Sequence, residues 1–472
     1  MKKWLRGLIC VLPAALFLSY YPLIQFGSDA TMNFEISVPM IWLLIFDFLA
    51  TIEVIRLKKY RLVRKTWWYL LLPGFVSLSL IWTANFTRGL LTVGLMWMVV
   101  VAISDLIALR EDFKNDVFRE TFWKWFFGTS VAACFWCVIQ CILDITGVSR
   151  DYSLLCLGCT YRSFGFPHPN GFAIEPQFMG NLLLAPAIIS GAFLVKPALK
   201  EKLSAKILGP KYVVVGFFIF VATLFLTFSR GAIYSFVVAM LFMSGFVIAR
   251  AGQKIKKITY KLVGIMWGLV ILAFVFTLNL QGIMSEIGPT KDTYMDGVSK
   301  VVSQLSLGII DIKHEKSQIK QGNQEPDLPV ENSVENSAKT EETEFDGYVP
   351  ESTDTRIRLT SVALDLWNDN PENILFGVGI GGAGQALYDN SLIIHPKEIV
   401  QNEYASLLLE TGVIGMVLAI SLCVLVLRKI WKSRKFVAVV TLAIAYGISL
   451  CFFSGLANAL HIYLLPVVLF LI

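Results

Sequence analysis

Four arginines lie outside the clusters of basic residues that separate the apolar runs of the chain. They are Arg162, Arg230, Arg356 and Arg358, and Arg230 occupies the very short connection TFSRG between two apolar runs. The planar guanidinium of arginine can hold phosphate through two parallel hydrogen bonds without losing its charge. Two or three of these side chains could therefore clamp a diphosphate. The alternative for each arginine is that it reaches lipid headgroups or pairs with an acid.

Several acids and histidines near these arginines could accept a proton during a reaction. Glu175 begins an apolar run, and Glu403 and Glu410 are seven residues apart, which places both on one face of a helix. Charged residues inside apolar runs are costly and are usually functional or paired. His168 and His395 could act as general bases near neutral pH, although a single loop histidine is more often solvated.

Two further patterns imitate chemical sites but favour structural roles. Cys156 and Cys159 form one CxxC pair without a second pair of zinc ligands, so we expect a local disulfide. The glycine-rich segment from Phe376 to Gly384 imitates a nucleotide-binding loop, but no apolar strand precedes it. We interpret it as a tight turn that lets backbone segments approach closely, with N–H groups that could help to bind an anion.

The composition excludes a soluble multidomain protein. The 472 residues are 56% hydrophobic and only 16% charged, with a mean hydropathy of +0.64, whereas soluble chains carry about 25% charged residues. A membrane helix needs roughly 20 mostly apolar residues. Such runs lie near residues 5–26, 38–55, 67–86, 89–109, 122–146, 172–195, 212–229, 231–249, 260–280, 402–427 and 436–455, with a shorter one at 456–472. We expect an all-α polytopic membrane protein with about twelve transmembrane helices.

The positions of lysine and arginine predict the orientation. Of the 41 basic residues, 28 fall at the N-terminus or in every alternate connection between apolar runs. Because cytoplasmic connections retain basic residues, we expect both termini in the cytoplasm and the large segment 281–401 outside. The same distribution argues against a nucleic-acid partner, despite the formal charge of +6.

Residues 281–401 form one large extracytoplasmic loop in this interpretation, with 20 acidic and 9 basic residues. Within it, residues 316–350 are polar and almost without large apolar side chains, so we expect a disordered linker. Asp354 or Thr355 can then cap a helix that begins at Arg356 and ends at Asn370-Pro371. The chain thus divides into residues 1–280 with transmembrane helices 1–9, the loop 281–401 with a helix over 356–370, and residues 402–472 with helices 10–12.

The order of these features resembles the O-antigen polymerase and ligase family of bacterial cell-envelope enzymes, which are Wzy- and WaaL-like. Those proteins have about twelve spans and a large outer loop between spans nine and ten. Four local patterns carry the resemblance: Ser229-Arg230-Gly231; Arg162 and Gly165 followed by Glu175-Pro176; Arg356, Ala363, Pro371 and Gly377-Val378-Gly379; and Asn402, Gly412 and Gly415. Each pattern alone is weak, but four in this order are fairly specific.

The resemblance implies a membrane glycosyltransferase that uses oligosaccharides linked to a polyprenyl diphosphate, such as undecaprenyl diphosphate, at the outer face of the bacterial cytoplasmic membrane. It also implies that no cofactor, metal ion or ATP is needed, because departure of the diphosphate drives the transfer. The implied roles are diphosphate binding by Arg230, Arg356, Arg162 and Arg358, proton transfer by His395, Glu403 or Glu175, and support from Gln401, Asn402 and Glu410.

One position departs from the family pattern and bears on the function. Ligases of the family carry a histidine immediately before the asparagine that corresponds to Asn402, and this chain has Gln401, which cannot act as a base. A lesser departure is Thr360, where the family often has tryptophan. The first departure favours a polymerase that joins repeat units into a cell-surface polysaccharide such as a capsule.

Two alternatives remain beside the polymerase. One is a ligase that transfers finished glycan to an acceptor, and the other is a lipid or oligosaccharide transporter. Transporters often contain internal repeats, and no repeat is visible in this sequence. By family analogy, the expected partners are membrane lipid, a chain-length regulator and a flippase.

Overall fold

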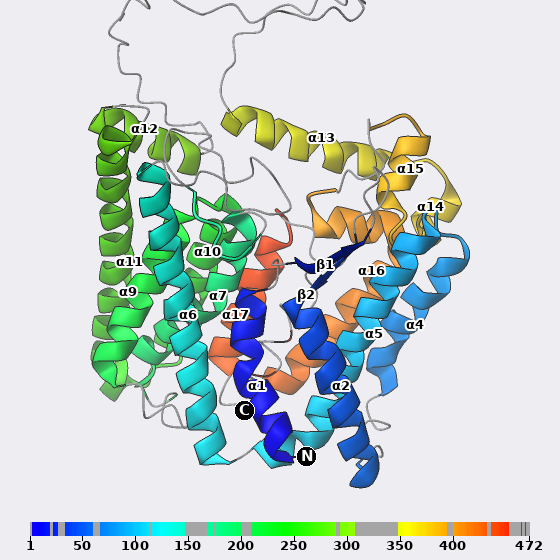
Figure 1. The fold of residues 1–472 in the computed structure, drawn as a ribbon, viewed down its shortest axis with the longest axis horizontal. Coiled ribbons are helices and arrows are strands. Elements are labelled where there is room, and N and C mark those ends of the chain that lie inside the picture. The colour runs from blue at the N-terminus through cyan, green and yellow to red at the C-terminus, as the bar shows by residue number, and fades with distance from the viewer. Residues whose placement is uncertain are drawn as a thin grey trace, which may run out of the picture.

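The structure is a computed structural model (Figure 1). It describes residues 2–18, 22–26, 34–59, 67–113, 115–146, 168–173, 176–197, 199, 209–288, 293–306, 348–393, 400–431, 436–452, 464 and 468. Several predictions fall outside these residues: those for Arg162, Glu175, His395, the Cys156 and Cys159 pair, residues 316–347 and most of the last apolar run.

The described chain is a bundle of helices with one small sheet. The first half contains α1 (Lys2–Phe17), β1 (Pro22–Phe26), β2 (Phe34–Ser37), α2 (Val38–Arg56), η1 (Trp67–Leu70), α4 (Leu71–Leu78), η2 (Ser79–Ile81), α5 (Phe86–Leu109), η3 (Arg110–Phe113) and α6 (Asp116–Ile145). The second half contains α7 (Pro176–Val195), α9 (Pro210–Leu226), α10 (Arg230–Ala249), α11 (Gln253–Ile287), α12 (Tyr294–Leu305), α13 (Tyr348–Asn368), α14 (Pro371–Phe376), α15 (Ala383–Asp389), α16 (Glu403–Trp431) and α17 (Phe436–Ser449). Strands β1 and β2 pair antiparallel.

The helices confirm the all-α polytopic class. By length and composition, seven helical segments among the described residues can cross a membrane: Val38–Arg56, Phe86–Phe113, Asp116–Ile145, Pro176–Val195, Arg230–Ala249, Ile255–Ile287 and Glu403–Arg428. Three shorter apolar helices cover Trp68–Ile81, Pro210–Leu226 and Val437–Ser449. The total of about twelve spans stays a prediction.

Two of the expected spans differ from a continuous helix. In the run 5–26 the helix ends at Phe17, and the run continues as strand β1 from Pro22; proline has no N–H with which to extend a helix. The run 67–86 is divided into η1, α4 and η2, which end at Ile81. Pro73 sits in the first turn of α4, where its missing N–H is tolerated, and this accounts for the new helix start within the run.

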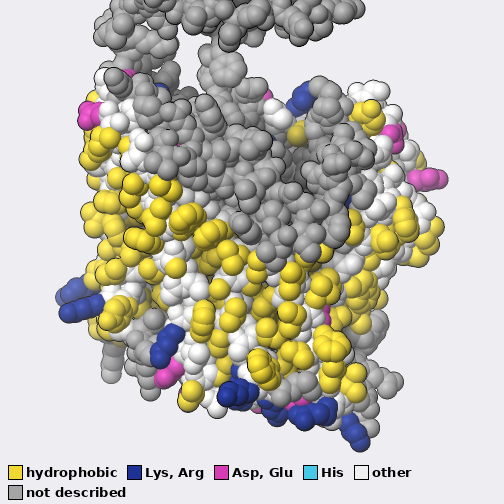
Figure 2. Space-filling view, in the orientation of Figure 1, with side chains coloured by type: hydrophobic (Ala, Val, Ile, Leu, Met, Phe, Trp, Pro, Cys, Tyr) yellow, Lys and Arg dark blue, Asp and Glu magenta, His cyan; other side chains and the backbone are white. Residues whose placement is uncertain are grey.

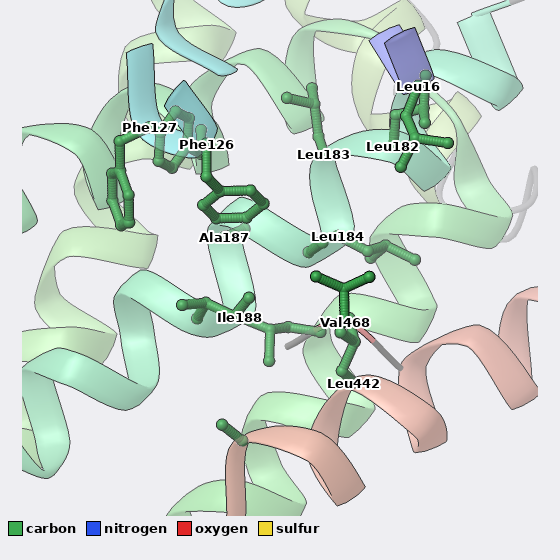
Figure 3. Close-up of a cluster of buried hydrophobic side chains, with 14 of the residues drawn as sticks. Leu16, Phe126, Phe127, Leu182, Leu183, Leu184, Ala187, Ile188, Leu442 and Val468 are labelled. Carbon is green, nitrogen blue, oxygen red and sulfur yellow. The ribbon is translucent and has the colours of Figure 1, made fainter. Parts of the chain in front are cut away.

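Helix α7 forms the centre of the bundle and is apolar on all sides. Within it, 89% of an 18-residue apolar stretch is buried. A helix of this kind must be surrounded by other helices. Figure 3 shows Leu183 and Ile188 of α7 among side chains from other elements, including Phe126 of α6 and Leu442 of α17. The surrounding helices therefore fix the position of α7 and of the residues at its N-terminal end.

Glycines bring α7 close to its neighbour α10. A Cβ added at Gly180 would lie 2.8 Å from Cβ of Ser229, and one added at Gly191 would lie 2.8 Å from Cε of Met240. Small residues at such contacts let helix backbones approach closely in a membrane. The first turns of α7 and α10 are consequently neighbours.

Basic side chains gather at one end of the molecule, where α1 begins, beyond a broad hydrophobic band (Figure 2). There Asp112 joins three elements: its carboxylate oxygens lie 2.7 Å from Nζ of Lys2 and 2.8 Å from Nζ of Lys59. Arg6 donates to the backbone carbonyl of Asp112. The ends of α1 and α2 are thus fastened to η3.

Helices α12 to α15 lie at the opposite end of the bundle (Figure 1). Helix α13 packs on α15 and α16 through a small apolar core that contains Leu359, Ala363, Leu366, Leu387 and Leu409. We call this part the loop subdomain. It consists of helices α12 to α15, the glycine-rich turn between α14 and α15, and the kinked helix α16.

The loop helices are more extensive than the sequence pattern predicts. The expected helix from Arg356 begins earlier, at Tyr348, so residues 348–350 belong to it and not to the linker. It ends before Asn370-Pro371 as expected, but Asn370 also caps α14, accepting from the N–H of Asn373 at 2.8 Å. Helix α12 was not anticipated, although Thr293 and Asp296 form a reciprocal cap at its start, a recognisable sequence signal.

Candidate active site

Arg356 is held in place by two glutamines from distant parts of the chain. Its Nε donates to Oε1 of Gln401 at 2.6 Å, and its Nη2 donates to Oε1 of Gln177 at 3.2 Å. Because the guanidinium is planar and rigid, two hydrogen bonds from different nitrogens define its orientation. The N-terminal ends of α7 and α16 therefore meet at α13.

Gln177 also connects Arg356 to the start of α10. Its Nε2 donates to the carbonyl of Phe452 at 2.6 Å. Phe452 in turn lies against Gly231, where an added Cβ would be 2.7 Å from Cβ of Phe452. Arg356 and the first turn of α10, which begins at Arg230, are thus linked through two residues.

Arg230 is buried at the N-terminus of α10, with 8% of its surface exposed. Phe228, two residues earlier, has a φ of 50°, a left-handed conformation that residues other than glycine adopt rarely and often at functional sites. The N-terminal end of a helix carries partial positive charge. Arg230 and the helix end both contribute positive charge to this corner of the bundle.

The residues that open α16 are fixed by backbone contacts. Oδ1 of Asn402 accepts from the N–H groups of Tyr404 and Ala405 at 3.1 and 3.2 Å, as an N-cap does. The N–H of Glu403 donates to the carbonyl of Leu450 at 2.9 Å, and Glu403 is only 4% exposed. A buried carboxyl therefore lies two residues from the glutamine that binds Arg356.

Glu410 is engaged with the glycine-rich turn. Its Oε1 accepts from the N–H of Ala383 at 3.4 Å. The N–H of Gly381 also donates to this carboxyl, and the positive charge of Arg88 attracts it. Arg88 was not among the four arginines singled out from the sequence. Glu410 therefore contributes to the turn that carries α15.

The glycine-rich turn is a close contact between backbones, as the sequence predicted. Gly377, Gly379 and Gly381 have positive φ, and an added Cβ at each would lie within 2.6 Å of another segment's backbone. Its N–H groups are used inside the protein: those of Val378 and Gly379 donate to the carbonyls of α16 residues 409 and 410 at 2.8 and 3.0 Å. The suggestion that they help to bind an anion is therefore not supported.

Arg358 lies apart from this arrangement, whereas His168 packs beside the segment that leads into α10. Arg358 is exposed on α13, and two residues from Arg356 correspond to about 200° around the helix. His168 is buried, not solvated, with its ring centroid 5.4 Å from that of Phe228. Burial lowers the pKa of His168 to about 4, so this imidazole is neutral near pH 7.

The structure thus brings Arg356, Gln401 and Gln177 together. Arg230 begins the neighbouring helix α10, and Glu403 begins α16. Nothing in the local sequence marks Gln177, although it directly follows the Glu175-Pro176 motif. An arginine at a helix N-terminus, as Arg230 is, can bind an anion, and a buried carboxyl such as that of Glu403 can accept a proton. Within the described residues, no group of three His, Cys, Asp or Glu side chains is placed to hold a metal ion; a metal-free reaction stays a prediction.

Comparison with known proteins gives a family match over part of the chain. A family model described as O-Antigen ligase (Wzy_C) matches residues 215–420, a range that includes Arg230, Arg356, Gln401, Glu403 and Glu410. No curated protein matches the chain.

Proposed function

We propose that this chain, whose residues 215–420 match the family model described as O-Antigen ligase (Wzy_C), is a polysaccharide polymerase of the Wzy- and WaaL-like family. It would join polyprenyl-diphosphate-linked oligosaccharide repeat units into a cell-surface polysaccharide. The reaction would take place at the outer face of the bacterial cytoplasmic membrane.

The observation that carries the choice of polymerase is the contact between Gln401 and Arg356. Gln401 stands where the ligases that this chain resembles have histidine, and its Oε1 accepts from Nε of Arg356 at 2.6 Å. An amide oxygen can orient a guanidinium, but an amide cannot take up a proton near neutral pH. In our proposal, Gln401 therefore positions Arg356, and another group acts as the base.

The donor diphosphate would bind between Arg356 and Arg230, with Arg162 as a further predicted contact. Arg358 is exposed on the other side of α13 and would contribute little. Charge accumulates on the diphosphate as its bond to the sugar breaks. The guanidinium of Arg356, held in advance by Gln177 and Gln401, stabilises that charge without having to reorganise. Burial of Arg230 strengthens the effect, because a low-dielectric environment increases electrostatic interactions.

The transfer itself needs a base for the acceptor sugar. The hydroxyl oxygen of the acceptor forms a bond to the anomeric carbon of the donor, the bond from that carbon to the diphosphate oxygen breaks, and the hydroxyl proton passes to a carboxylate. We assign the base to Glu403, because it is buried and lies two residues from Gln401. His395 and Glu175, outside the described residues, are the alternative bases.

The orientation follows from the distribution of charge. The end with clustered lysines and arginines (Figure 2) would face the cytoplasm, together with both termini. The loop subdomain and the arginines would then face outward, where lipid-linked repeat units are presented. A flippase that delivers these units and a chain-length regulator are the partners that such a reaction calls for.

The experiment is to delete the gene in its host, extract the polyprenyl-linked glycans and measure their size. The proposal expects single repeat units to accumulate and long surface polymer to disappear. Re-expression of the wild-type chain should restore the polymer, whereas Arg356→Ala at equal membrane abundance should not. Full-length polymer from the Arg356→Ala protein would contradict the mechanism.

A ligase is the second candidate, because the matched family model carries the description O-Antigen ligase. Deletion would then leave long polymer attached to the carrier lipid, not single units. Unchanged glycans would contradict both enzymes and favour a transporter.

A further inference from the structure

A groove opens on the loop subdomain, away from the arginines. It has a volume of about 670 Å³, within the range of small-molecule binding sites. The backbone of the glycine-rich turn lines it, together with two aromatic and four polar side chains. These are the side chains of Trp82, Phe376, Glu372, Asn373, Asp389 and Asn390. The proposed transfer reaction does not use any of these residues.

The aromatic side of the groove is built by three segments. The rings of Trp82 and Phe376 lie 6.0 Å apart and nearly perpendicular, and Trp82 also packs near Phe75. The N–H of Ala84 donates to the carbonyl of Val378 at 3.2 Å, which fastens the turn to the segment after η2. Phe376 is nevertheless 42% exposed, so part of an apolar ring is accessible on a fixed support.

The polar side of the groove consists of acids and oriented amides. Glu372 and Asp389 are exposed. The amide of Asn373 donates to the backbone carbonyl of Leu366 at 3.0 Å, and the amide of Asn390 donates to that of Ala386 at 2.8 Å. These bonds fix the amides, while carboxylates and amides together offer acceptors and donors for ligand hydroxyl groups.

We propose that this groove binds the oligosaccharide part of a substrate, at a distance from the bond that reacts. A sugar ring has an apolar C–H face that packs on the electron-rich face of an aromatic ring, and its hydroxyls need a neighbouring set of fixed polar groups. The groove supplies both. Because two carboxylates but no Lys or Arg are among the described residues that line it, it disfavours the diphosphate. This inference rests on the proposed glycosyl transfer.

Helix α13 relates the groove to the arginine site. Leu366 lines the groove and Arg356 lies ten residues earlier on the same helix, which corresponds to about 15 Å along the axis. A glycan of several sugars can span that distance. Its charged end would lie at the arginines, and its neutral sugars would lie at the aromatic and acidic end.

The test measures glycan binding by the full chain in detergent, without any turnover. The probes are fragments of the host's surface polysaccharide, one and four repeat units long, freed of lipid and labelled at the reducing end. We expect Phe376→Ala to weaken binding by about tenfold, and Glu372→Gln to weaken it by a few-fold. Tyr388→Ala is the matched control, since Tyr388 is a similarly exposed aromatic on α15 that does not line the groove.

The two fragment lengths distinguish the source of the sugars. A loss that is equal for both fragments assigns the groove to a single repeat unit, and a loss confined to the longer fragment assigns it to the growing chain. Unchanged affinity in Phe376→Ala and Glu372→Gln, or an equal loss in Tyr388→Ala, would overturn the proposal. Arg356→Ala should bind the lipid-free fragments normally, so failure of the transfer mechanism and failure of the groove give separate results.

Discussion

The side chain of Gln401 accepts a 2.6 Å hydrogen bond from Nε of Arg356, across 45 residues of sequence. This bond joins the loop helix α13 to the residue that precedes the cap of α16. A second bond from Arg356 to Gln177 adds the first turn of α7. The orientation of one guanidinium therefore depends on the correct packing of three helices, and substitutions at Gln401 should report on it.

Gln401→His should make the transfer activity dependent on pH. Gln401 is exposed, so a histidine there would have a pKa at or below about 6.5, lowered by the neighbouring arginine. Neutral imidazole has one acceptor nitrogen, but imidazolium has none and repels Arg356. We expect activity near that of wild type at about pH 8 and a fall of up to about tenfold at about pH 5.5, measured as polymer formed from lipid-linked repeat units.

Gln401→Glu is the control for this variant, because a carboxylate keeps its acceptor oxygens down to about pH 4.3. Its activity relative to wild type should be flat over the same range. Parallel pH profiles for the histidine and glutamate variants would mean that the bond to Arg356 has no part in the reaction.

Removal of Arg356 should have a much larger effect than removal of Arg358. Loss of one fixed donor to a developing negative charge costs roughly a hundredfold or more in kcat, and we expect this for Arg356→Ala. Arg356→Lys keeps the charge but loses the planar fork and should retain part of the activity. Arg358→Ala is the matched comparison on the opposite side of the helix, with an expected loss below about threefold. Equal losses would show that α13 provides only general positive charge.

The class of fold and part of the site could be predicted from local sequence, because each depends on neighbours in the chain. Apolar runs identify membrane helices, and Arg230 and Arg356 stand out by their positions between those runs. Gln177 could not be predicted in this way. Its partner Arg356 is 179 residues away, and a neutral glutamine at the start of an apolar helix has no local feature that marks it.

The same dependence on distant parts of the chain explains why the anion-binding role suggested for the glycine-rich turn was wrong. Glycines at 377, 379 and 381 indicate close backbone contact, but the sequence does not say whether a ligand or the protein occupies their N–H groups. Two carbonyls of α16 accept from the N–H groups of Val378 and Gly379 in this turn, and they are available there because the helix is kinked at Gly412. Such pairing depends on tertiary structure.

Acid should destabilise the protein through His168. Burial lowers the pKa of His168 to about 4, whereas the unfolded chain has a value near 6.5. As the pH falls below about 6.5 the unfolded state takes up the proton first, so stability is lost progressively down to about pH 4, by about 3 kcal/mol at most. Thermal unfolding in detergent should show a smaller fall in Tm between about pH 7 and 4.5 for His168→Leu than for wild type. Equal falls would mean that other groups dominate.

Gly379→Ala should destabilise the loop subdomain, whereas Gly268→Ala should not. Gly379 has a φ of 86°, and an added Cβ would lie 2.4 Å from Cα of Thr83. Alanine in the left-handed region costs about 1–2 kcal/mol, and the overlap with fixed backbone adds to this cost. Gly268 lies within α11 with no atom within 4 Å of an added Cβ, so alanine there should stabilise the helix by about 0.5–1 kcal/mol.

The readout for the two glycine variants is the Tm in detergent together with protease sensitivity of the loop subdomain. Gly379→Ala should lower the Tm by several degrees and expose cleavage sites between α14 and α15, since the contact with Thr83 also supports the wall formed by Trp82 and Phe376. Gly268→Ala should leave both properties at or above the wild-type level. If Gly379→Ala behaved like Gly268→Ala, the turn would have to tolerate separation from the α4–α5 connection, and the groove would then lack a fixed support.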